Sequence, residues 1–343
     1  MLKTWIPTLG RLRLLVQLLM LFIGVYGSLF VGHYAADKLS SVLPALSCSY
    51  DQMNGGYCVL IRTQHMLHHQ IGMAVARAHE LTFSMVLPLL IALATFFAFF
   101  FVLGKAFCGW VCPLGTLQEI VGKIGRRFGI GIRRAELPVS RLRPVKWLIL
   151  VGLVFLLPLL TGLGVTPHSL GNPYCDVCPA RIATTLLTGK ADQLALNMGG
   201  SWSFGLGALA NWLFGFVLVG ALALRQPFCR ICPLLAFNSI FQRLSPARLV
   251  KPSRASCGNC RMCTTACPMD IPEISQAEGN QAYNEDCTLC GRCAEYCPQD
   301  GVISIKWAHV TVFRSSRDYC KARVRGELPD GTVKLAAKGA SDA

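Results

Sequence analysis

Long apolar stretches alternate with polar segments along this chain. Four stretches are long enough to cross a bilayer, since a helix of about 20 apolar residues spans its hydrocarbon core. They cover residues 12–32, 81–103, 146–164 and 203–224. This pattern predicts an α-helical membrane protein with four transmembrane helices in two hairpins. The charges before the first stretch resemble a signal peptide, but its apolar run is too long, so we expect an uncleaved anchor.

The composition supports this class, with 53% hydrophobic and 15% charged residues and a mean hydropathy of +0.46. A net charge of +15 is also typical of nucleic-acid-binding proteins, but here basic residues gather in segment 104–146, whereas segments 33–80 and 165–200 are balanced. By the positive-inside rule, we expect a multi-pass protein of the inner (cytoplasmic) membrane with both termini cytoplasmic and no nucleic-acid partner.

Two runs of four cysteines follow the last apolar stretch. Each has the spacing Cys-x2-Cys-x2-Cys-x3-Cys-Pro, which is typical of a bacterial two-cluster ferredoxin. The runs consist of Cys257, Cys260, Cys263 and Cys267, and of Cys287, Cys290, Cys293 and Cys297. A zinc ribbon would use two shorter pairs, and a disulfide scaffold would need an oxidising compartment.

In such ferredoxins the fourth cysteine of each run ligates the other cluster. The prediction is therefore two [4Fe-4S] clusters with crosswise ligation. Cluster 1 takes Cys257, Cys260, Cys263 and Cys297, and cluster 2 takes Cys287, Cys290, Cys293 and Cys267. We expect a membrane domain over 1–245, a small α+β ferredoxin domain over 246–312, on the cytoplasmic side where thiolates stay reduced, and a tail over 313–343.

Two further cysteine pairs, each followed by proline, stand at the cytoplasmic ends of the second and fourth stretches. They are Cys108 with Cys112, and Cys229 with Cys232. Their repetition indicates a duplicated hairpin unit. Four cysteines at one depth can hold an additional metal centre or mark a redox docking site, or they can be buried thiols that pack the hairpins together. Amphipathic helices follow both pairs, and we expect them to lie along the membrane surface.

Four more cysteines fall in the two segments expected on the outer side. Cys48 and Cys58 lie in the first, and Cys175 and Cys178 lie in the second. The usual interpretation there is disulfide bonding, for example Cys48 with Cys58, and a Cys175–Cys178 disulfide would be strained and reducible. The alternative is a metal site on the outer face.

The first outer segment is also rich in histidine and methionine, which are copper ligands. Among these residues His65, His68, His69 and Met73 have helical spacing. The alternative is an interfacial helix whose histidines face water. Trp5, Trp147, His33 and His168 are candidate quinone-lining residues, although interfacial tryptophans also serve as anchors. No histidine lies deep in an apolar stretch, which argues against a haem.

The ordered combination of these motifs resembles the NapH/NosR group of membrane-bound polyferredoxins. The match covers the four apolar stretches, Phe107-Cys-Gly-Trp-Val-Cys-Pro-Leu114, the Cys229/Cys232 pair and the two ferredoxin runs. The family's second pair usually has three intervening residues, and here there are two. The resemblance implies a quinol dehydrogenase component that passes electrons toward a periplasmic acceptor, with quinone and other redox subunits as partners.

Three functions remain open at this point. The first is electron transfer between the quinone pool and a partner redox enzyme. The second is an electron-driven copper reductase or assembly factor for a periplasmic metalloenzyme, suggested by the outer cysteines and the His/Met segment. The third is an anchoring subunit of a larger redox complex.

Overall fold

A computed structural model describes most of the chain. The described residues are 8–32, 50–51, 55–56, 59–78, 83–130, 139–191, 194–196, 198–252, 257 and 260–325.

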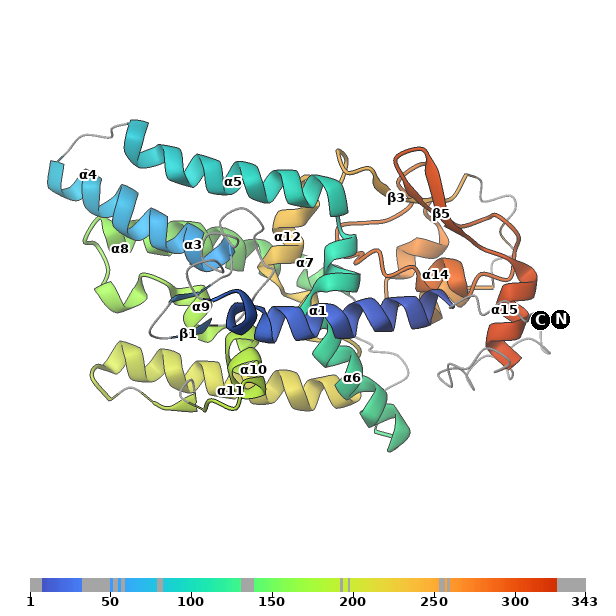
Figure 1. Ribbon diagram of the computed structural model, residues 1–343, viewed down its shortest axis with the longest axis horizontal. Coiled ribbons are helices and arrows are strands. Elements are labelled where there is room, and N and C mark those ends of the chain that lie inside the picture. Colours follow the sequence, from blue (N-terminus) through green and yellow to red (C-terminus); the bar gives the residue numbers. More distant parts are fainter. Residues whose placement is uncertain are drawn as a thin grey trace.

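Four long helices lie side by side along the long axis of the molecule (Figure 1). They are α1 (Leu9–Val31), α5 (Phe83–Leu103), α7 (Val139–Leu148) continued by η3 (Ile149–Leu156) and α8 (Leu157–Gly162), and α11 (Ser201–Ala223). Each contains a stretch apolar and long enough to cross a membrane. These four candidate spans confirm the predicted four-helix membrane architecture. Helices suit a bilayer because they satisfy all their backbone hydrogen bonds internally.

Shorter helices fill the segments between α1 and α5 and between α8 and α11. They are α3 (Val59–His65), η1 (Met66–Gly72) and α4 (Met73–Ala78), then η4 (His168–Leu170), α9 (Pro173–Val177) and α10 (Pro179–Leu187). Both segments were expected to be outer loops, and their described parts instead form helices that pack into the bundle. Leu60 of α3 and Tyr174 of α9 are buried in one core with Phe96 of α5. Polar residues interrupt the apolar runs of these two segments, so a pattern of apolar stretches does not predict their helices.

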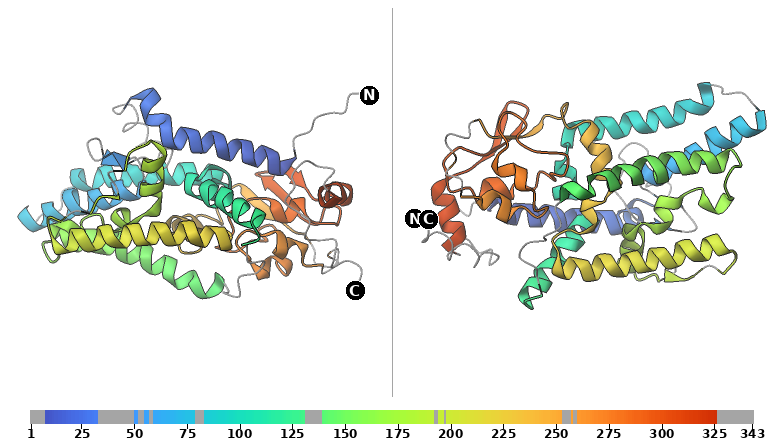
Figure 2. Two further views of the ribbon diagram at one scale, coloured as in Figure 1. Left: turned by 90° about the horizontal axis from the view of Figure 1, so that it is seen from below. Right: turned by 180° about the vertical axis from the view of Figure 1, so that it is seen from behind.

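The first of these segments runs beside α5 and α8 from the middle of the bundle to the end away from the ferredoxin part (Figure 2). Gly72 of η1 and Gly162 of α8 allow the close approach. A Cβ atom at Gly72 would lie 2.6 Å from the Cα atom of Gly162. Such small-residue crossings are typical of helices in membranes.

At the opposite end, the cysteine pairs lie in turns that lead into helices. The turn η2 (Phe107–Val111) precedes α6 (Pro113–Arg127), and η6 (Phe228–Arg230) precedes α12 (Pro233–Ile240). Helix α6 packs against α11, where a Cβ atom at Gly125 would lie 2.1 Å from the carbonyl oxygen of Leu222. Helix α12 is not a surface helix as expected, because Phe237 is buried and stacks on Phe96 with ring centroids 4.7 Å apart.

The C-terminal part is a small α+β unit. Strands β3 (Ala247–Val250), β4 (Ser304–Trp307) and β5 (Val310–Arg314) form an antiparallel sheet in the order β3-β4-β5. The cysteine runs lie around the helices α13 (Met262–Ala266), η7 (Pro272–Ser275) and α14 (Arg292–Glu295), and α15 (Arg317–Arg325) follows the sheet. A separate hairpin of β1 (Tyr50–Asp51) and β2 (Gly55–Gly56) belongs to the membrane part.

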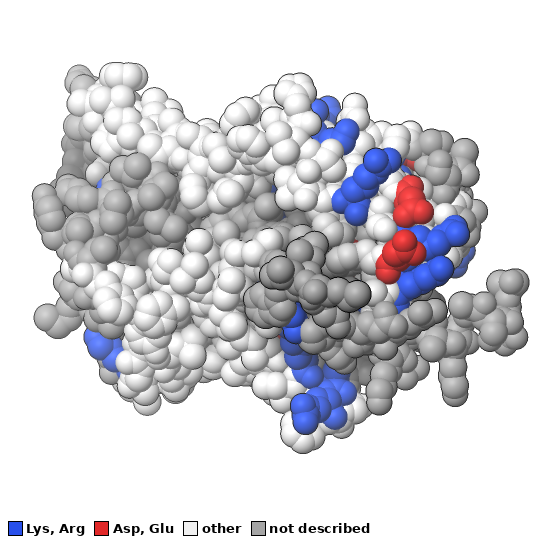
Figure 3. Space-filling view, turned by 45° about the vertical axis from the view of Figure 1, so that its right-hand side comes forward, with Lys and Arg blue, Asp and Glu red and all other residues white. Residues whose placement is uncertain are grey.

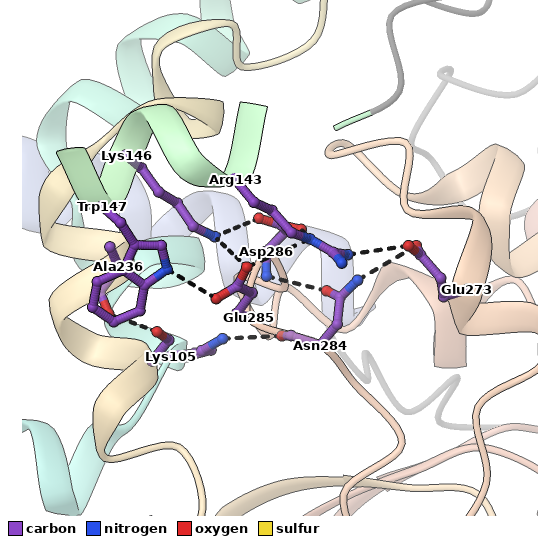
Figure 4. A network of polar contacts seen from close by, with 10 residues as sticks. Lys105, Arg143, Lys146, Trp147, Ala236, Glu273, Asn284, Glu285 and Asp286 are labelled. Carbon is purple, nitrogen blue, oxygen red and sulfur yellow. Dashed lines mark hydrogen bonds and ion pairs between the residues drawn. The ribbon is translucent and has the colours of Figure 1, made fainter. Parts of the chain in front are cut away.

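Buried ion pairs join this unit to the membrane helices. Lys146 at the start of the third span is fully buried and lies 2.6 Å from a carboxylate oxygen of Asp286. Arg143 lies 2.6 Å from the other oxygen of Asp286 and 3.1 Å from Glu273 (Figure 4). On the face shown in Figure 3, charges gather at this end of the molecule, whereas the part that holds the spans shows few.

A second junction centres on Glu119 of α6. Its carboxylate forms ion pairs with Arg13 of α1 and, at 2.6 Å, with Arg292 beside the second cysteine run. Burial opposes ionisation, but the charges of Arg292 and Arg13 overcome it and lower the pKa of Glu119 to about 2. One buried carboxylate therefore holds a membrane span, an interfacial helix and the ferredoxin part together.

We expect Glu119→Gln to lower the free energy of unfolding in detergent at pH 7 by about 3 kcal/mol. The reason is linkage: a pKa depressed from 4.5 to about 2 contributes stability above pH 4.5 that is lost as the pH falls toward 2. The difference between wild type and variant should be equal at pH 8 and pH 6 and should shrink below about pH 4.5. Chemical unfolding checks this, with the exposed Glu278→Gln as control. Equal stability of wild type and Glu119→Gln at pH 7 would contradict it.

Candidate iron–sulfur relay

The structure brings together the sulfurs assigned to cluster 2. Cys293 interacts electrostatically with Cys290, Cys287 and Cys267. The same four cysteines line one cavity in the ferredoxin part. Cys267 comes from the first run, so the cavity gathers cysteines of both runs, as crosswise ligation requires. Cys263 of the first run also interacts electrostatically with Cys293, and the assignment of ligands stays a prediction.

The sulfurs assigned to cluster 1 also gather. Cys263 and Cys297 both interact electrostatically with Cys257 and Cys260. Cys320 of α15 is buried beside this group and its thiol donates to the carbonyl oxygen of Tyr296 at 3.4 Å. That contact gives Cys320 a packing role in covering the group.

Local backbone conformation directs amides at these sulfurs. Leu289 and Gly291 have φ angles of 49° and 80°, and the amide of Leu289 donates to the Cys287 sulfur at 3.3 Å. Burial raises the pKa of the Cys287 and Cys263 thiols to about 11. Iron must therefore displace protons when it binds, as is usual for thiolate sites. A bound [4Fe-4S] cluster would supply one-electron redox chemistry here.

The membrane cysteines form a third group, which we call the inner quartet: Cys108, Cys112, Cys229 and Cys232. Cys229 interacts electrostatically with all three of the others. The quartet joins residues about 120 positions apart, and it lies among buried apolar residues of both cores. Four thiols from two separated pairs are a donor set that can hold zinc or an iron–sulfur cluster.

Gln118 of α6 fixes one pair of the inner quartet against the other. Its side-chain oxygen accepts the amide of Phe228 at 3.0 Å, and its nitrogen lies 3.7 Å from the Cys229 sulfur. Cys112 and Cys232 each precede a proline that begins a helix. Burial raises the pKa of the Cys232 thiol, and the backbone amides of Leu234 and Leu235 at the start of α12 oppose that shift.

The inner quartet lies directly against the cysteines assigned to cluster 2. A Cβ atom at Gly109 would lie 2.4 Å from the carbonyl oxygen of Thr288 and 3.1 Å from the Cα atom of Cys290, so this position requires glycine. Trp110 donates to the carbonyl oxygen of Leu289 at 3.1 Å. Lys105 is buried and interacts electrostatically with both Cys287 and Cys108. A cation between two thiolate groups stabilises their reduced, more negative states.

Of the outer cysteines, Cys175 and Cys178 lie within the described residues, whereas Cys48 and Cys58 lie outside them. Cys175 is buried in the core that the spans share. Gln64 donates to its sulfur at 3.0 Å, and the Tyr174 hydroxyl lies 3.8 Å from the Cys178 sulfur. Tyr174 also interacts electrostatically with Cys232 of the inner quartet.

Three histidines meet near the end of α8. Nitrogens of His68, His69 and His168 all lie within 4.8 Å of one another. The Nδ1 atom of His68 is buried and has no hydrogen-bond partner within the described part of the chain. His69 Nδ1 lies 3.2 Å from the sulfur of Met73. Helical spacing in the sequence grouped His68 and His69 with Met73. His168 lies in a different segment of the sequence and was not grouped with them.

Two of the four candidate quinone-lining residues are described, and each belongs to a different group of contacts. Trp147 donates to Glu285 at 3.2 Å, and therefore takes part in the ferredoxin junction. His168 belongs to the histidine group. Trp5 and His33 lie outside the described residues.

Comparison with known proteins agrees with this architecture. Residues 85–131 and 205–252 each match the model of a 4Fe-4S binding domain, so the same model covers both pairs of the inner quartet. Residues 256–303 match the model of a 4Fe-4S dicluster domain. The double match supports the duplicated hairpin unit. No solved structure matches the chain significantly.

Several curated relatives are similar over part of the chain. The ferredoxin-type protein NapH of Escherichia coli is 26% identical over 210 residues, which cover 60% of this chain and 63% of NapH. The regulatory protein NosR of Pseudomonas aeruginosa is 30% identical over 218 residues, which cover 62% of this chain and 27% of NosR. YccM of Escherichia coli is 28% identical over 215 residues, or 53% of its length. The chain thus matches about half to two thirds of YccM and NapH and a smaller part of NosR.

Crosswise ligation can be tested with single substitutions. We expect Cys267→Ala and Cys290→Ala to remove the same cluster signal, and Cys297→Ala to remove the other, because cluster 2 draws one ligand from the first run. Electron paramagnetic resonance of the reduced full-length protein checks this. Cys320→Ala is the matched control and should leave both signals. Loss of the same signal in the Cys267→Ala and Cys297→Ala variants would contradict the assignment.

Proposed function

We propose that this chain, a membrane-bound polyferredoxin of the NapH/NosR type, carries electrons between the membrane quinone pool and a partner redox enzyme. In this role it is a quinol dehydrogenase component. Clusters 1 and 2 and a third centre on the inner quartet form the relay.

The contact of the inner quartet with cluster 2 carries this proposal. Gly109 allows the turn between Cys108 and Cys112 to touch the backbone of Cys290. The buried Lys105 interacts electrostatically with Cys108 of one group and with Cys287 of the other, so the two groups are close enough for an electron on one to pass to the other. A ferredoxin that served only soluble partners would have no use for such a contact with the membrane helices.

Charge supports a cytoplasmic ferredoxin part. The basic residues Lys123, Arg143 and Lys146 lie at the ferredoxin end of the bundle, where they pair with Glu119 or Asp286. By the positive-inside rule this end faces the cytoplasm of an inner membrane. The inner quartet then lies near the cytoplasmic interface, where a quinol head group can reach it.

The electron balance defines the roles. Oxidation of one quinol to quinone releases two electrons and two protons, and each [4Fe-4S] cluster accepts one electron. Two centres must therefore take the electrons in turn before a partner enzyme removes them. The buried Lys105 favours reduction of the centres on either side of it.

We expect anaerobically purified protein to lose about four irons per chain when Cys229 and Cys232 are both replaced by serine. A quinol analogue should bleach the clusters of wild type, and the variant should keep clusters 1 and 2 but lose this quinol-dependent bleaching. Dithionite reduction is the control, because it should reduce clusters 1 and 2 in both proteins. Iron analysis and visible spectroscopy measure both effects.

Two results would contradict the proposal. If the Cys229→Ser/Cys232→Ser variant keeps all its iron, the inner quartet does not hold an iron–sulfur centre. Wild-type clusters that dithionite reduces but no quinol analogue ever bleaches would remove the link to quinol.

The histidine group favours a second candidate function, the reduction of a metal such as copper for a periplasmic metalloenzyme. Imidazole and thioether groups are copper ligands, and Met73 lies beside His69. The buried Nδ1 atom of His68 has no hydrogen-bond partner among the described residues, so its lone pair is available to a ligand. In this function one reduced cluster would lose an electron as Cu(II) becomes Cu(I).

For this second function we expect wild type to bind about one copper per chain, and His68→Ala/His168→Ala to bind none, because the variant removes two of the three imidazoles of the group. Metal analysis after gel filtration measures this. His309→Ala is the control, because His309 is exposed in the ferredoxin part. Equal copper in all three proteins would exclude the histidine group as the site.

A further inference from the structure

The large apolar side chains that the ferredoxin part exposes lie together on one hairpin. Among the described residues that follow Leu244, they are those of Trp307, Val310 and Val312, which are 47%, 64% and 62% exposed. Trp307 ends β4 and Val310 begins β5, and the two are directly opposite each other in the sheet. Their side chains therefore lie side by side on one face. Single exposed apolar residues are common on proteins, but a group of them marks a surface that another apolar surface covers.

The hairpin lies at the end of a membrane span. The indole nitrogen of Trp307 donates to the carbonyl oxygen of Val102 at 3.0 Å. Val102 is in the last turn of α5, and its own side chain is exposed. In Figure 1 the hairpin continues the edge of the molecule along which α5 runs. Tryptophan at the end of a span is typical of the membrane–water interface, where its ring contacts lipid and its N–H group finds a polar partner.

Leu244 extends this apolar surface between the span and the hairpin. Its side chain is exposed just after α12. A Cβ atom at Gly104, the residue after α5, would lie 2.2 Å from the hydroxyl oxygen of Ser245. The amide of Ala308, in the turn of the hairpin, donates to the carbonyl oxygen of Pro246 at 2.9 Å. Segment 244–246 therefore touches both the end of α5 and the hairpin. We call the whole surface the hairpin patch: Val102, Leu244, Trp307, Val310 and Val312.

The charges around the hairpin patch are of one sign. Segments 240–252 and 302–316 contain no Asp or Glu, and their basic residues are Arg243, Arg248, Lys251, Lys306 and Arg314. Arg248 of β3 is directly opposite Lys306 of β4 in the sheet. Like charges in this position are destabilising, so an anion that faces them would stabilise the pair. The surface beside the patch is therefore complementary to an anionic one.

We propose that the hairpin patch inserts into the leaflet at the ferredoxin end of the bundle, with its basic residues against the headgroups of anionic phospholipid. Two observations favour lipid over a protein as the occupant. The patch continues the exposed apolar side of a span, and basic residues beside an apolar face are typical of segments that lie in the membrane interface. The proposal is independent of the quinol link and of the third centre.

This contact gives the ferredoxin part a third attachment. The junctions at Asp286 and Glu119 join it to other parts of the protein, whereas the hairpin patch joins it to the bilayer itself. Ile305 of β4 packs against the core that contains both cysteine runs. Anchoring of the hairpin therefore fixes how far the cysteine runs lie from the lipid surface.

The test places a photoreactive benzophenone amino acid at single positions of the full-length protein. The protein is reconstituted in vesicles of phosphatidylcholine and phosphatidylglycerol, irradiated and analysed for covalently bound lipid by mass spectrometry. The probe at Val310 should crosslink to lipid, as should a probe at Phe101 on the exposed side of α5. Asp318 is the control, because it is exposed on α15, at the end of the molecule away from the spans (Figure 1), and its probe should bind no lipid.

The role of charge is tested with Arg248→Gln/Lys306→Gln that carries the same probe at Val310. The lipid adduct should fall severalfold in vesicles with phosphatidylglycerol, because each cation near an anionic surface adds to binding. In phosphatidylcholine alone the double variant and wild type should give equal yields. The visible absorbance of the iron–sulfur clusters reports whether the ferredoxin part of each variant is folded.

Three results would overturn the proposal. A probe at Val310 without a lipid adduct, while the probe at Phe101 has one, would place the hairpin in water. A crosslink from Val310 to a second copy of the chain in place of lipid would make the hairpin patch a protein interface. Equal yields from the double variant and wild type in vesicles with phosphatidylglycerol would exclude the anionic headgroups.

Discussion

The charge on Glu119 is the interaction on which the arrangement of the molecule depends. Glu119 is buried at the point where α1, α6 and the ferredoxin part meet. It forms ion pairs with Arg13 of α1 and with Arg292 of the ferredoxin part. Its neighbour Gln118 points to the other side of α6 and holds the turn that contains Cys229. Two consecutive residues of one helix therefore fix the inner quartet and its distance from cluster 2. A buried carboxylate that is removed leaves two buried cations unpaired, which is costly.

Much of the architecture could be predicted because its signals are local. The length of the apolar stretches predicts the four spans, and the spacing of the cysteines predicts the two ferredoxin runs. The packing of segment 59–78 against the spans could not be predicted, because Gln64, His68 and His69 interrupt its apolar pattern. Gln64 and His68 are buried by contacts with residues about 100 positions away, and no local pattern carries that information.

The inner quartet was predicted as a set of residues but not as a site. Its two pairs are far apart in sequence, and only the packing of α6 against α11 shows that they meet. One signal was present and was overlooked: both Cys58 and Cys112 are followed by a glutamine six residues later. A polar residue repeated at a fixed distance from a cysteine indicates a shared contact, because an amide buried near lipid needs partners for its oxygen and nitrogen.

The division of the inner quartet between two distant turns has a consequence for biosynthesis. Cys108 and Cys112 emerge from the ribosome long before Cys229 and Cys232, and two full spans separate the pairs. The first half of the chain therefore does not contain the whole inner quartet. The centre proposed on the inner quartet can form only after the fourth span is made, because two of its four thiolates follow that span.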